Sequence, residues 1–267
     1  MENVLFKEIK KHSLHWQSSG KGQALILLHG WGMNSAVWQQ TVAQLSEHFC
    51  VHVVDLPGFG HSHAASFSSL EDLANQVLEH APSNAIWLGW SLGGLIATHI
   101  ALKEPERVDA LITVASSPKF AAEGKWRGIQ PSVLDNFKQQ LLEDFSLTID
   151  RFMALQAMGS PSAKSDIKML KHAVLSRPAP SPEALMSGLD ILATVDYRNE
   201  LKKLTIPTLR LYGRLDGLVP RKVAKDVDLL TTESTSFVFQ TSSHAPFITE
   251  ANLFSQKIIE FAHQNFK

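Results

Sequence analysis

The first half of the chain alternates short apolar runs with longer segments of helical periodicity. The short runs occupy residues 24–29, 50–54, 85–88 and 110–114. The segments with apolar residues at helical spacing occupy residues 37–49, 70–78 and 92–103. A run that is apolar throughout, such as 24–29, is typical of a strand buried on both faces. Strands about 30 residues apart with helices between them predict a parallel sheet covered by helices on both sides.

This alternation stops near Pro118, and no convincing strand follows until after residue 187. The intervening stretch has three helical segments punctuated by prolines, at residues 133–142, 147–158 and 163–175. The strand and helix pattern then resumes with strands at 207–212 and 236–239 and helices at 221–230 and 251–264. We therefore predict one α/β core formed by residues 1–117 and 188–267, with a helical lid inserted at 118–187.

Composition narrows the class of protein. The chain has 267 residues, of which 44% are hydrophobic and 19% charged, so it can bury a large core and is not globally disordered. Its formal net charge of −1 disfavours nucleic acid as a partner, because nucleic-acid binders carry a basic face. The single cysteine, Cys50, cannot form an internal disulfide, which favours a reducing compartment.

Two segments bear on export and membrane insertion. Residues 1–7 carry Glu2 where a signal peptide has basic residues, and their apolar run is too short for one. Residues 81–102 contain no Asp, Glu, Lys or Arg, but polar residues, a proline and three glycines interrupt the stretch. We expect a cytoplasmic protein that does not enter a membrane.

The strongest chemical signal is the sequence Gly-Trp-Ser-Leu-Gly at residues 89–93. It follows a predicted strand and opens a predicted helix, which is the context of a nucleophile elbow. A serine on such a tight turn has a strained backbone, and small residues on either side avoid collisions. The turn also directs the helix N-terminus at developing negative charge. We predict that Ser91 is a nucleophile, the alternative being a glycine-containing loop met by chance.

A serine needs a base, and the base needs an orienting acid. Among the twelve histidines, His244 lies in the loop after the last predicted strand, whereas His99 and His263 lie within helices. Asp216 follows the strand at 207–212, which gives the chain order Ser, Asp, His of α/β-hydrolases. Asp190 and Asp196 precede that strand, which is not where the acid of such a triad lies. We predict a triad of Ser91, Asp216 and His244.

The oxyanion of an acyl-transfer intermediate requires two backbone N–H donors. One is expected from Leu92, the residue after the nucleophile. The other is expected from Trp31, in the loop His29-Gly30-Trp31-Gly32 after the first predicted strand. The glycines would let this loop approach the serine closely. We interpret the His29 side chain as part of the scaffold rather than as a base.

The predicted lid is basic. Residues 119–177 contain nine Lys and Arg against six Asp and Glu. Lys164, Lys168 and Lys171 lie at spacings i, i+4 and i+7, so they share one face of the predicted helix. Such a run can be simply a solvated face, or it can be the docking surface of an acidic partner.

With these residues, the chain resembles an α/β-hydrolase and, more closely, the BioH-type pimeloyl-[acyl-carrier protein] methyl ester esterases of bacterial biotin synthesis. The generic part of the resemblance is the serine motif. The more particular part consists of LLHGWGMN at 27–34, VDLPGFG at 54–60, AIWLGWSLGGL at 85–95, PERV at 105–108, TVASSPKF at 113–120, RFMALQAMG at 151–159, LRLYGRLDGLVPRKV at 209–223 and HAPF at 244–247.

The resemblance implies hydrolysis of the methyl ester of pimeloyl-[acyl-carrier protein], with release of methanol and no need for a metal or cofactor. It implies substrate contacts from Trp31, Ser91, Leu92, Phe152, Met153, Ala154, Leu155, Gln156 and His244. It also implies that the acidic carrier protein docks on Arg151, Lys164 and Lys168. Lysine stands at 164 and 168 where such proteins can have arginine, which removes bidentate pairing. We expect a monomer whose partner is the carrier protein.

Two other functions remain open at this point. A broad-specificity carboxylesterase would use the same triad on small free esters. A receptor that kept the fold without catalysis is a different class of protein, and retention of Ser91, Asp216 and His244 argues against it.

Overall fold

A seven-stranded sheet forms the centre of the computed structural model, which describes residues 13–231 and 234–266. Its strands are β1 (Trp16–Ser19), β2 (Ala24–Leu28), β3 (Cys50–Val54), β4 (Ala85–Trp90), β5 (Val108–Val114), β6 (Thr208–Gly213) and β7 (Ser234–Phe239). Their order is β1-β3-β2-β4-β5-β6-β7, and all neighbours are parallel except β1, which runs antiparallel to β3. The expected α/β fold with a mostly parallel sheet is confirmed. The predicted absence of a signal at residues 1–7 falls outside the described residues.

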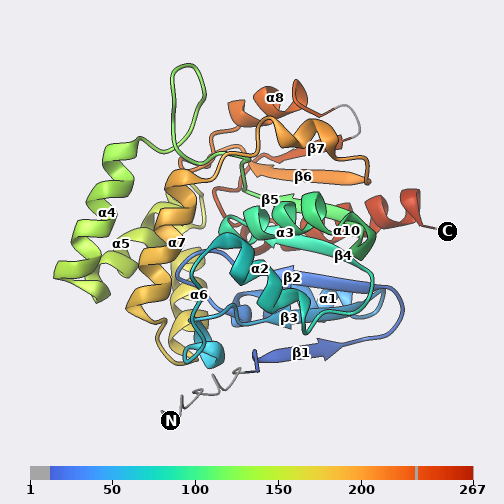
Figure 1. Ribbon diagram of the computed structural model, residues 1–267, viewed down its shortest axis with the longest axis horizontal. Helices are drawn as coiled ribbons and strands as arrows, with labels where there is room; N and C mark the ends of the chain where they lie inside the picture. Colours follow the sequence, from blue (N-terminus) through green and yellow to red (C-terminus); the bar gives the residue numbers. More distant parts are fainter. Residues whose placement is uncertain (1–12, 232–233, 267) are drawn as a thin grey trace, which may run out of the picture.

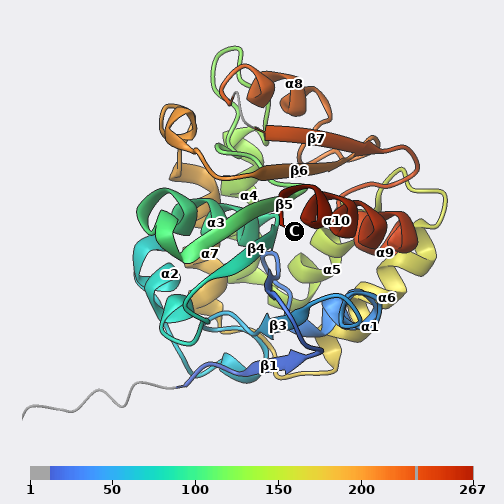
Figure 2. The same ribbon diagram turned by 90° about the vertical axis from the view of Figure 1, so that its right-hand side faces the viewer.

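Helices cover both faces of this sheet (Figure 2). On one face lie α2 (Leu70–Leu78) and α3 (Leu92–Lys103), and on the other lie α1 (Gln39–Leu45) and α10 (Ala251–Asn265). Two shorter helices, α8 (Lys222–Asp228) and α9 (Pro246–Thr249), follow β6 and β7. All six residues of β4 are buried, which explains why the central strands have continuously apolar sequences. No helix among the described residues is both long and apolar enough to cross a bilayer.

Four helices between β5 and β6 gather at the carboxyl ends of the parallel strands (Figure 1). They are α4 (Pro131–Glu143), α5 (Phe145–Ala157), α6 (Ala163–Leu175) and α7 (Pro182–Thr194), and we call them the lid helices. The predicted lid boundary at residue 187 falls inside α7, so the helical layer extends further along the chain than that boundary. The division of the chain into core and lid otherwise stays a prediction.

The structure differs from the sequence-based expectations at three elements. Strand β1 was not predicted, because Trp16-Gln17-Ser18-Ser19 has no apolar run; it forms by pairing with β3. Helix α7 was also not predicted in a segment rich in proline. The helix expected at 37–49 is divided into a 3₁₀ turn, η1 (Ser35–Trp38), and the shorter helix α1. The remaining short turns are η2 (Gly60–Ser62), η3 (Pro105–Arg107) and η4 (Glu200–Lys203).

The C-terminal end of α6 is tied to the sheet core. Arg177, just beyond α6, forms an ion pair with buried Asp55 at 2.7 Å. The side-chain amide of Asn34 donates to the carbonyl oxygens of Ala173 and Val174 near the end of the same helix. These carbonyls also accept hydrogen bonds from the Ser176 hydroxyl and the Arg177 N–H, so Asn34 adds a further link between the end of α6 and the sheet core.

Candidate active site

Ser91 occupies the sharp turn between β4 and α3. Its backbone φ of 55° lies in the left-handed region, which non-glycine residues seldom adopt. Its N–H donates to the carbonyl of Val114, and its carbonyl accepts from the hydroxyl of Ser116, both at 2.9 Å. These two bonds hold the strained turn in place. The geometry is that of a nucleophile elbow.

The neighbouring glycines are required by close packing of backbone on backbone. A Cβ at Gly89 would lie 2.1 Å from the carbonyl oxygen of Gly93. A Cβ at Gly93 would lie 2.4 Å from the carbonyl oxygen of Leu28, at the end of β2. A side chain at Gly89 would therefore push the start of α3 away from β4, and one at Gly93 would push it away from β2.

Asp216 and His244 form a buried pair. Asp216 follows β6 and His244 follows β7, so two adjacent strands bring them to the same sheet edge. The Nδ1 atom of His244 lies 2.8 Å from Oδ2 of Asp216. The other oxygen, Oδ1, accepts the backbone N–H groups of Leu218 and Val219 at 2.8 and 3.0 Å. The carboxylate is thus fixed in orientation, with one oxygen left for the imidazole.

The remaining nitrogen of His244, Nε2, is buried and has no hydrogen-bonding partner among the described residues. A hydrogen bond from Nδ1–H to Asp216 leaves Nε2 with its lone pair, which is the form a general base needs. Catalytic hydrogen bonds are often long in the absence of substrate and shorten when it binds. Nε2 is therefore available to a serine proton.

The loop between β2 and η1 packs directly against the elbow. A Cβ at Gly30 would lie 3.3 Å from Cβ of Ser91 and 3.2 Å from the Trp90 ring. Trp31 is the next residue in this loop. Leu92 is the first residue of α3, so its N–H has no acceptor within the helix. The two amides predicted to bind an oxyanion thus belong to segments that flank Ser91 on either side.

Trp31 is enclosed by the lid helices. Its indole N–H donates to the carbonyl of Leu185 at 2.8 Å, and its ring meets the ring of Phe152 edge-on at 4.7 Å. Gly188 lies so close that a Cβ there would be 2.6 Å from the indole. Sequence reasoning missed these contributions of α7. The sequence Ser181-Pro182-Glu183 could have revealed the helix, since serine caps it and proline is its first residue.

The segment Phe152–Gln156 divides between two faces of α5. Phe152, Met153 and Gln156 are buried, whereas Ala154 is exposed and Leu155 half-buried. Both side-chain amide atoms of Gln156 are buried without a hydrogen-bonding partner among the described residues. Its backbone carbonyl accepts the N–H of His244 at 3.0 Å, which places α5 next to His244.

The outer face of the lid helices carries an apolar groove of about 750 Å³ between α4, α5 and α6. Arg151, Ala154, Leu155, Met158 and Ile167 are among the residues that line it.

The basic residues of the lid differ in their surroundings. Arg151, Lys164 and Lys168 are exposed and form no ion pair with any residue in 13–231 or 234–266. Lys171, in contrast, is paired with Asp150 at 2.8 Å. The predicted face of three lysines therefore contains two with a free ammonium group.

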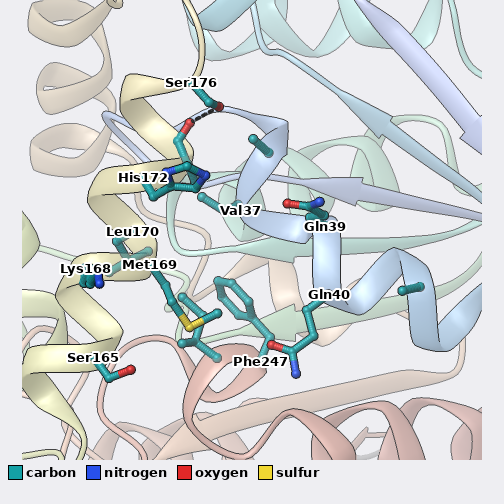
Figure 3. Close-up of a pocket in the computed structure, with 14 residues that line it drawn as sticks. Val37, Gln39, Gln40, Ser165, Lys168, Met169, Leu170, His172, Ser176 and Phe247 are labelled. Atoms are coloured by element: carbon teal, nitrogen blue, oxygen red, sulfur yellow. Dashed lines mark hydrogen bonds between the residues drawn. The ribbon is translucent and has the colours of Figure 1, made fainter.

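A second cavity, of about 650 Å³, lies between α6 and the η1–α1 segment (Figure 3). Lys168 and His172 of α6 face Gln39 and Gln40 across it, with Phe247 between the two sides. None of Ser91, Asp216 and His244 lines it.

The other acids and histidines considered for the triad have other partners in the structure. Asp190 pairs with Lys138, and Asp196 pairs with Arg198 and Lys119. Hydrogen bonds from Arg198, which outweigh the effect of partial burial, lower the pKa of Asp196 to about 2. His99 is bonded to the hydroxyl of Tyr197 at 2.6 Å. The described residues contain no group of three or more His, Cys, Asp or Glu placed to hold a metal ion.

Comparison with known proteins defines the class. Residues 23–251 match the family model described as the alpha/beta hydrolase fold. An esterase from Exiguobacterium antarcticum superposes with a TM-score of 0.82 at 22% identity, covering 94% of this chain and 95% of that one. A bromoperoxidase from Bacillus anthracis gives 0.84 at 20% identity, covering 94% and 95%. At such identities these structures show the fold alone, which is that of an α/β hydrolase.

Curated relatives define the family within this class. A pimeloyl-[acyl-carrier protein] methyl ester esterase of Vibrio cholerae is 64% identical over 250 residues, covering 94% of this chain and 98% of the relative. The protein of the same name from Vibrio parahaemolyticus is 65% identical with the same coverage, and one from Photobacterium profundum is 59% identical. The chain belongs to the family of pimeloyl-[acyl-carrier protein] methyl ester esterases.

Proposed function

We propose that this protein is a serine esterase that hydrolyses the methyl ester of pimeloyl-[acyl-carrier protein] in biotin synthesis. The observation that carries the proposal is the identity of 64% across nearly the whole length of a relative with that name. Ser91 on its elbow, and the buried pair of Asp216 and His244 that Trp90 of the same elbow contacts, supply the groups that such an activity needs.

In the first half of the reaction, Oγ of Ser91 attacks the carbonyl carbon of the methyl ester while Nε2 of His244 takes its proton. The negative charge on the carbonyl oxygen is stabilised by the amides of Trp31 and Leu92. Asp216 holds the imidazole in orientation and stabilises its positive charge. When the tetrahedral intermediate collapses, the C–O bond to the methoxy group breaks, His244 returns the proton, and methanol leaves.

In the second half, water replaces methanol. His244 takes a proton from the water as its oxygen attacks the acyl carbon. Collapse of the second intermediate breaks the bond to Ser91, which regains its proton from His244. The products are a free carboxyl group at the end of the pimeloyl chain and unchanged enzyme.

The lid helices supply the substrate contacts of this proposal. The buried side chains of Phe152, Met153 and Gln156 form its inner part; Phe152 contacts Trp31, and the backbone carbonyl of Gln156 contacts His244. The Gln156 amide offers a donor and an acceptor that no described side chain uses, so it suits a polar group of the substrate. Ala154 and Leu155 face the outer groove, where they would meet the part of the substrate nearer the carrier.

Docking of the carrier protein is assigned to Arg151, Lys164 and Lys168. These cations are exposed and unpaired within the described residues, and an acidic partner would neutralise them. Arg151 also lines the outer groove, so the docked carrier would lie at its edge. We place the reaction in the cytoplasm because the single cysteine allows no internal disulfide.

The test compares wild type with Ser91→Ala on the purified methyl ester of pimeloyl-carrier protein, with methanol release as the measurement. Loss of the nucleophile should lower turnover by about 10⁴–10⁶-fold. Dimethyl pimelate serves as the free-ester substrate. If wild type used the free ester as efficiently as the carrier-bound one, a broad-specificity carboxylesterase would replace this proposal. Equal turnover by both enzymes would instead disprove the role of Ser91.

A further inference from the structure

The backbone of His244 is held from two sides. Its carbonyl accepts the indole N–H of Trp90 at 2.7 Å, which fixes it to the end of β4. Its N–H donates to the carbonyl of Gln156 at 3.0 Å, which fixes it to lid helix α5. The position of the base therefore depends on the lid as well as on the sheet.

A second contact joins the same two parts of the molecule. Oδ2 of Asp166, in the first turn of α6, accepts the hydroxyl of Thr249 at 3.0 Å. It also accepts the hydroxyls of Ser160 and Ser162 at 2.8 and 3.1 Å. Thr249 ends α9, the helix that begins two residues after His244. One carboxylate oxygen thus connects the turn between α5 and α6 to the segment that carries the base.

The surroundings of Asp166 strengthen its hydrogen bond with Thr249. Asp166 is only 5% exposed and forms no ion pair with a described residue, so the three hydroxyl donors are what satisfies its carboxyl group. Hydrogen bonds to a charged acceptor are roughly twice as strong as neutral ones. The place of Asp166 in the first turn of α6 adds a favourable interaction with the positive end of the helix.

We propose that Asp166 is a positioning residue for the catalytic base. Through Thr249 it holds α9, and α9 with the Gln156 carbonyl holds the loop of His244 in the orientation that serves Ser91. The inference rests on the proposed function, since it takes His244 as the base. It adds that the α5–α6 turn, residues 158–162, is linked to the histidine loop through Asp166 and Thr249.

The experiment separates positioning from simple stabilisation of the lid. Thr249→Val removes the hydroxyl at nearly constant shape, and Thr249→Ser restores it. Asp166→Asn removes the charge but leaves the Thr249 hydroxyl, which also lies 3.5 Å from the carbonyl of Ala245. Thr194→Val is the matched control, because that hydroxyl bonds a helix carbonyl at the end of α7. The measurements are kcat and KM on 4-nitrophenyl acetate, which needs no carrier, and the melting temperature.

We expect kcat to fall about 10- to 100-fold in Thr249→Val and Asp166→Asn, as for a catalytic group displaced by a fraction of an ångström to 1 Å. KM should stay within about twofold, because neither Thr249 nor Asp166 is among the residues that the proposed function places against the substrate. Thr249→Ser and Thr194→Val should keep the wild-type kcat.

Two results would overturn the inference. One is a lowered melting temperature with unchanged kcat in Thr249→Val, which would show that the contact only stabilises the lid. The other is a failure of Thr249→Ser to restore kcat. Thr249→Val alone decides the matter if Asp166→Asn does not fold. Failure of the proposed function has a different signature, since Ser91→Ala would then hydrolyse the ester as wild type does.

Discussion

The Nδ1 atom of His244 meets Oδ2 of Asp216 at 2.8 Å, while Oδ1 of the same carboxylate is occupied by two backbone N–H groups. Because Leu218 and Val219 hold Oδ1, the carboxylate presents only Oδ2 to the imidazole. The bond therefore sets both the orientation of the ring and the nitrogen that carries its proton.

The first prediction concerns Asp216→Asn. The asparagine oxygen should keep the two backbone N–H groups, which turns its NH₂ group toward Nδ1 and forces the imidazole proton onto Nε2. The base is then blocked, so kcat should fall by about 10⁴-fold with little change in fold. Ester hydrolysis and the circular dichroism spectrum are the measurements. A variant with near-wild-type kcat would contradict the assigned role of Asp216.

Gly93→Ala tests the close packing of the elbow. The new Cβ would lie 2.4 Å from the carbonyl oxygen of Leu28, so the backbone must shift. We expect a loss of about 1–3 kcal/mol in the free energy of unfolding and a fall in kcat. Gly217→Ala is the control, because a Cβ there meets nothing within 4 Å. Urea unfolding that gives both variants the same stability would show that the elbow can relax.

Lys164→Glu combined with Lys168→Glu tests the docking surface. Reversed charge should repel an acidic carrier, so KM for the carrier-bound ester should rise about tenfold or more, with a steep dependence on salt. Turnover of dimethyl pimelate should stay within about twofold. The control is Lys202→Glu combined with Lys203→Glu, which makes the same change in net charge on exposed residues of η4. If both double variants raised KM equally, net charge rather than this surface would be responsible.

The buried side chain of His29 should make stability depend on pH. Burial lowers its pKa to about 4, against partial opposition from Asp55, while an unfolded histidine titrates near its ordinary value of about 6.5. Below pH 6.5 the unfolded chain therefore binds a proton that the native protein does not. The free energy of unfolding should fall by about 3 kcal/mol between pH 6.5 and 4 from this residue alone.

His15, His52 and His99 have pKa values lowered in the same direction and should add to the slope. The check is urea unfolding of wild type and His29→Gln at a series of pH values. In the variant, the free energy of unfolding should change less steeply with pH between 6.5 and 4. Parallel curves would mean that His29 is protonated in the native protein as readily as in the unfolded chain.

How much of the fold the sequence predicts depends on how each element is stabilised. Strands β2 and β4 are buried on both faces, so their sequences are apolar throughout and can be recognised directly. Strand β1 is an edge strand of mostly exposed residues and forms through hydrogen bonds to β3, which leave no mark in its composition. Two prolines precede α7 and a third, Pro182, is its first residue, so the segment did not look helical.

In the candidate site, too, some residues can be predicted from local sequence and others depend on tertiary packing. A local turn motif predicts Ser91 as the nucleophile, and chain order predicts Asp216 and His244 as its partners, so these predictions need no tertiary information. The faces of the segment Phe152–Gln156 could not be assigned, because burial there depends on the packing of α5 over Trp31 and His244. The contact between Asp166 and Thr249 joins residues 83 positions apart, which no local pattern reveals.

The position of the lid helices in the chain has a consequence for how this family can diversify. They connect β5 to β6, which are adjacent parallel strands, so the whole helical layer is one long crossover connection. The entropic cost of closing such a connection rises slowly with its length. A lineage can therefore replace this connection without moving the strands that carry Ser91, Asp216 and His244. A replacement would also have to supply an acceptor for the N–H of His244, which the carbonyl of Gln156 provides here.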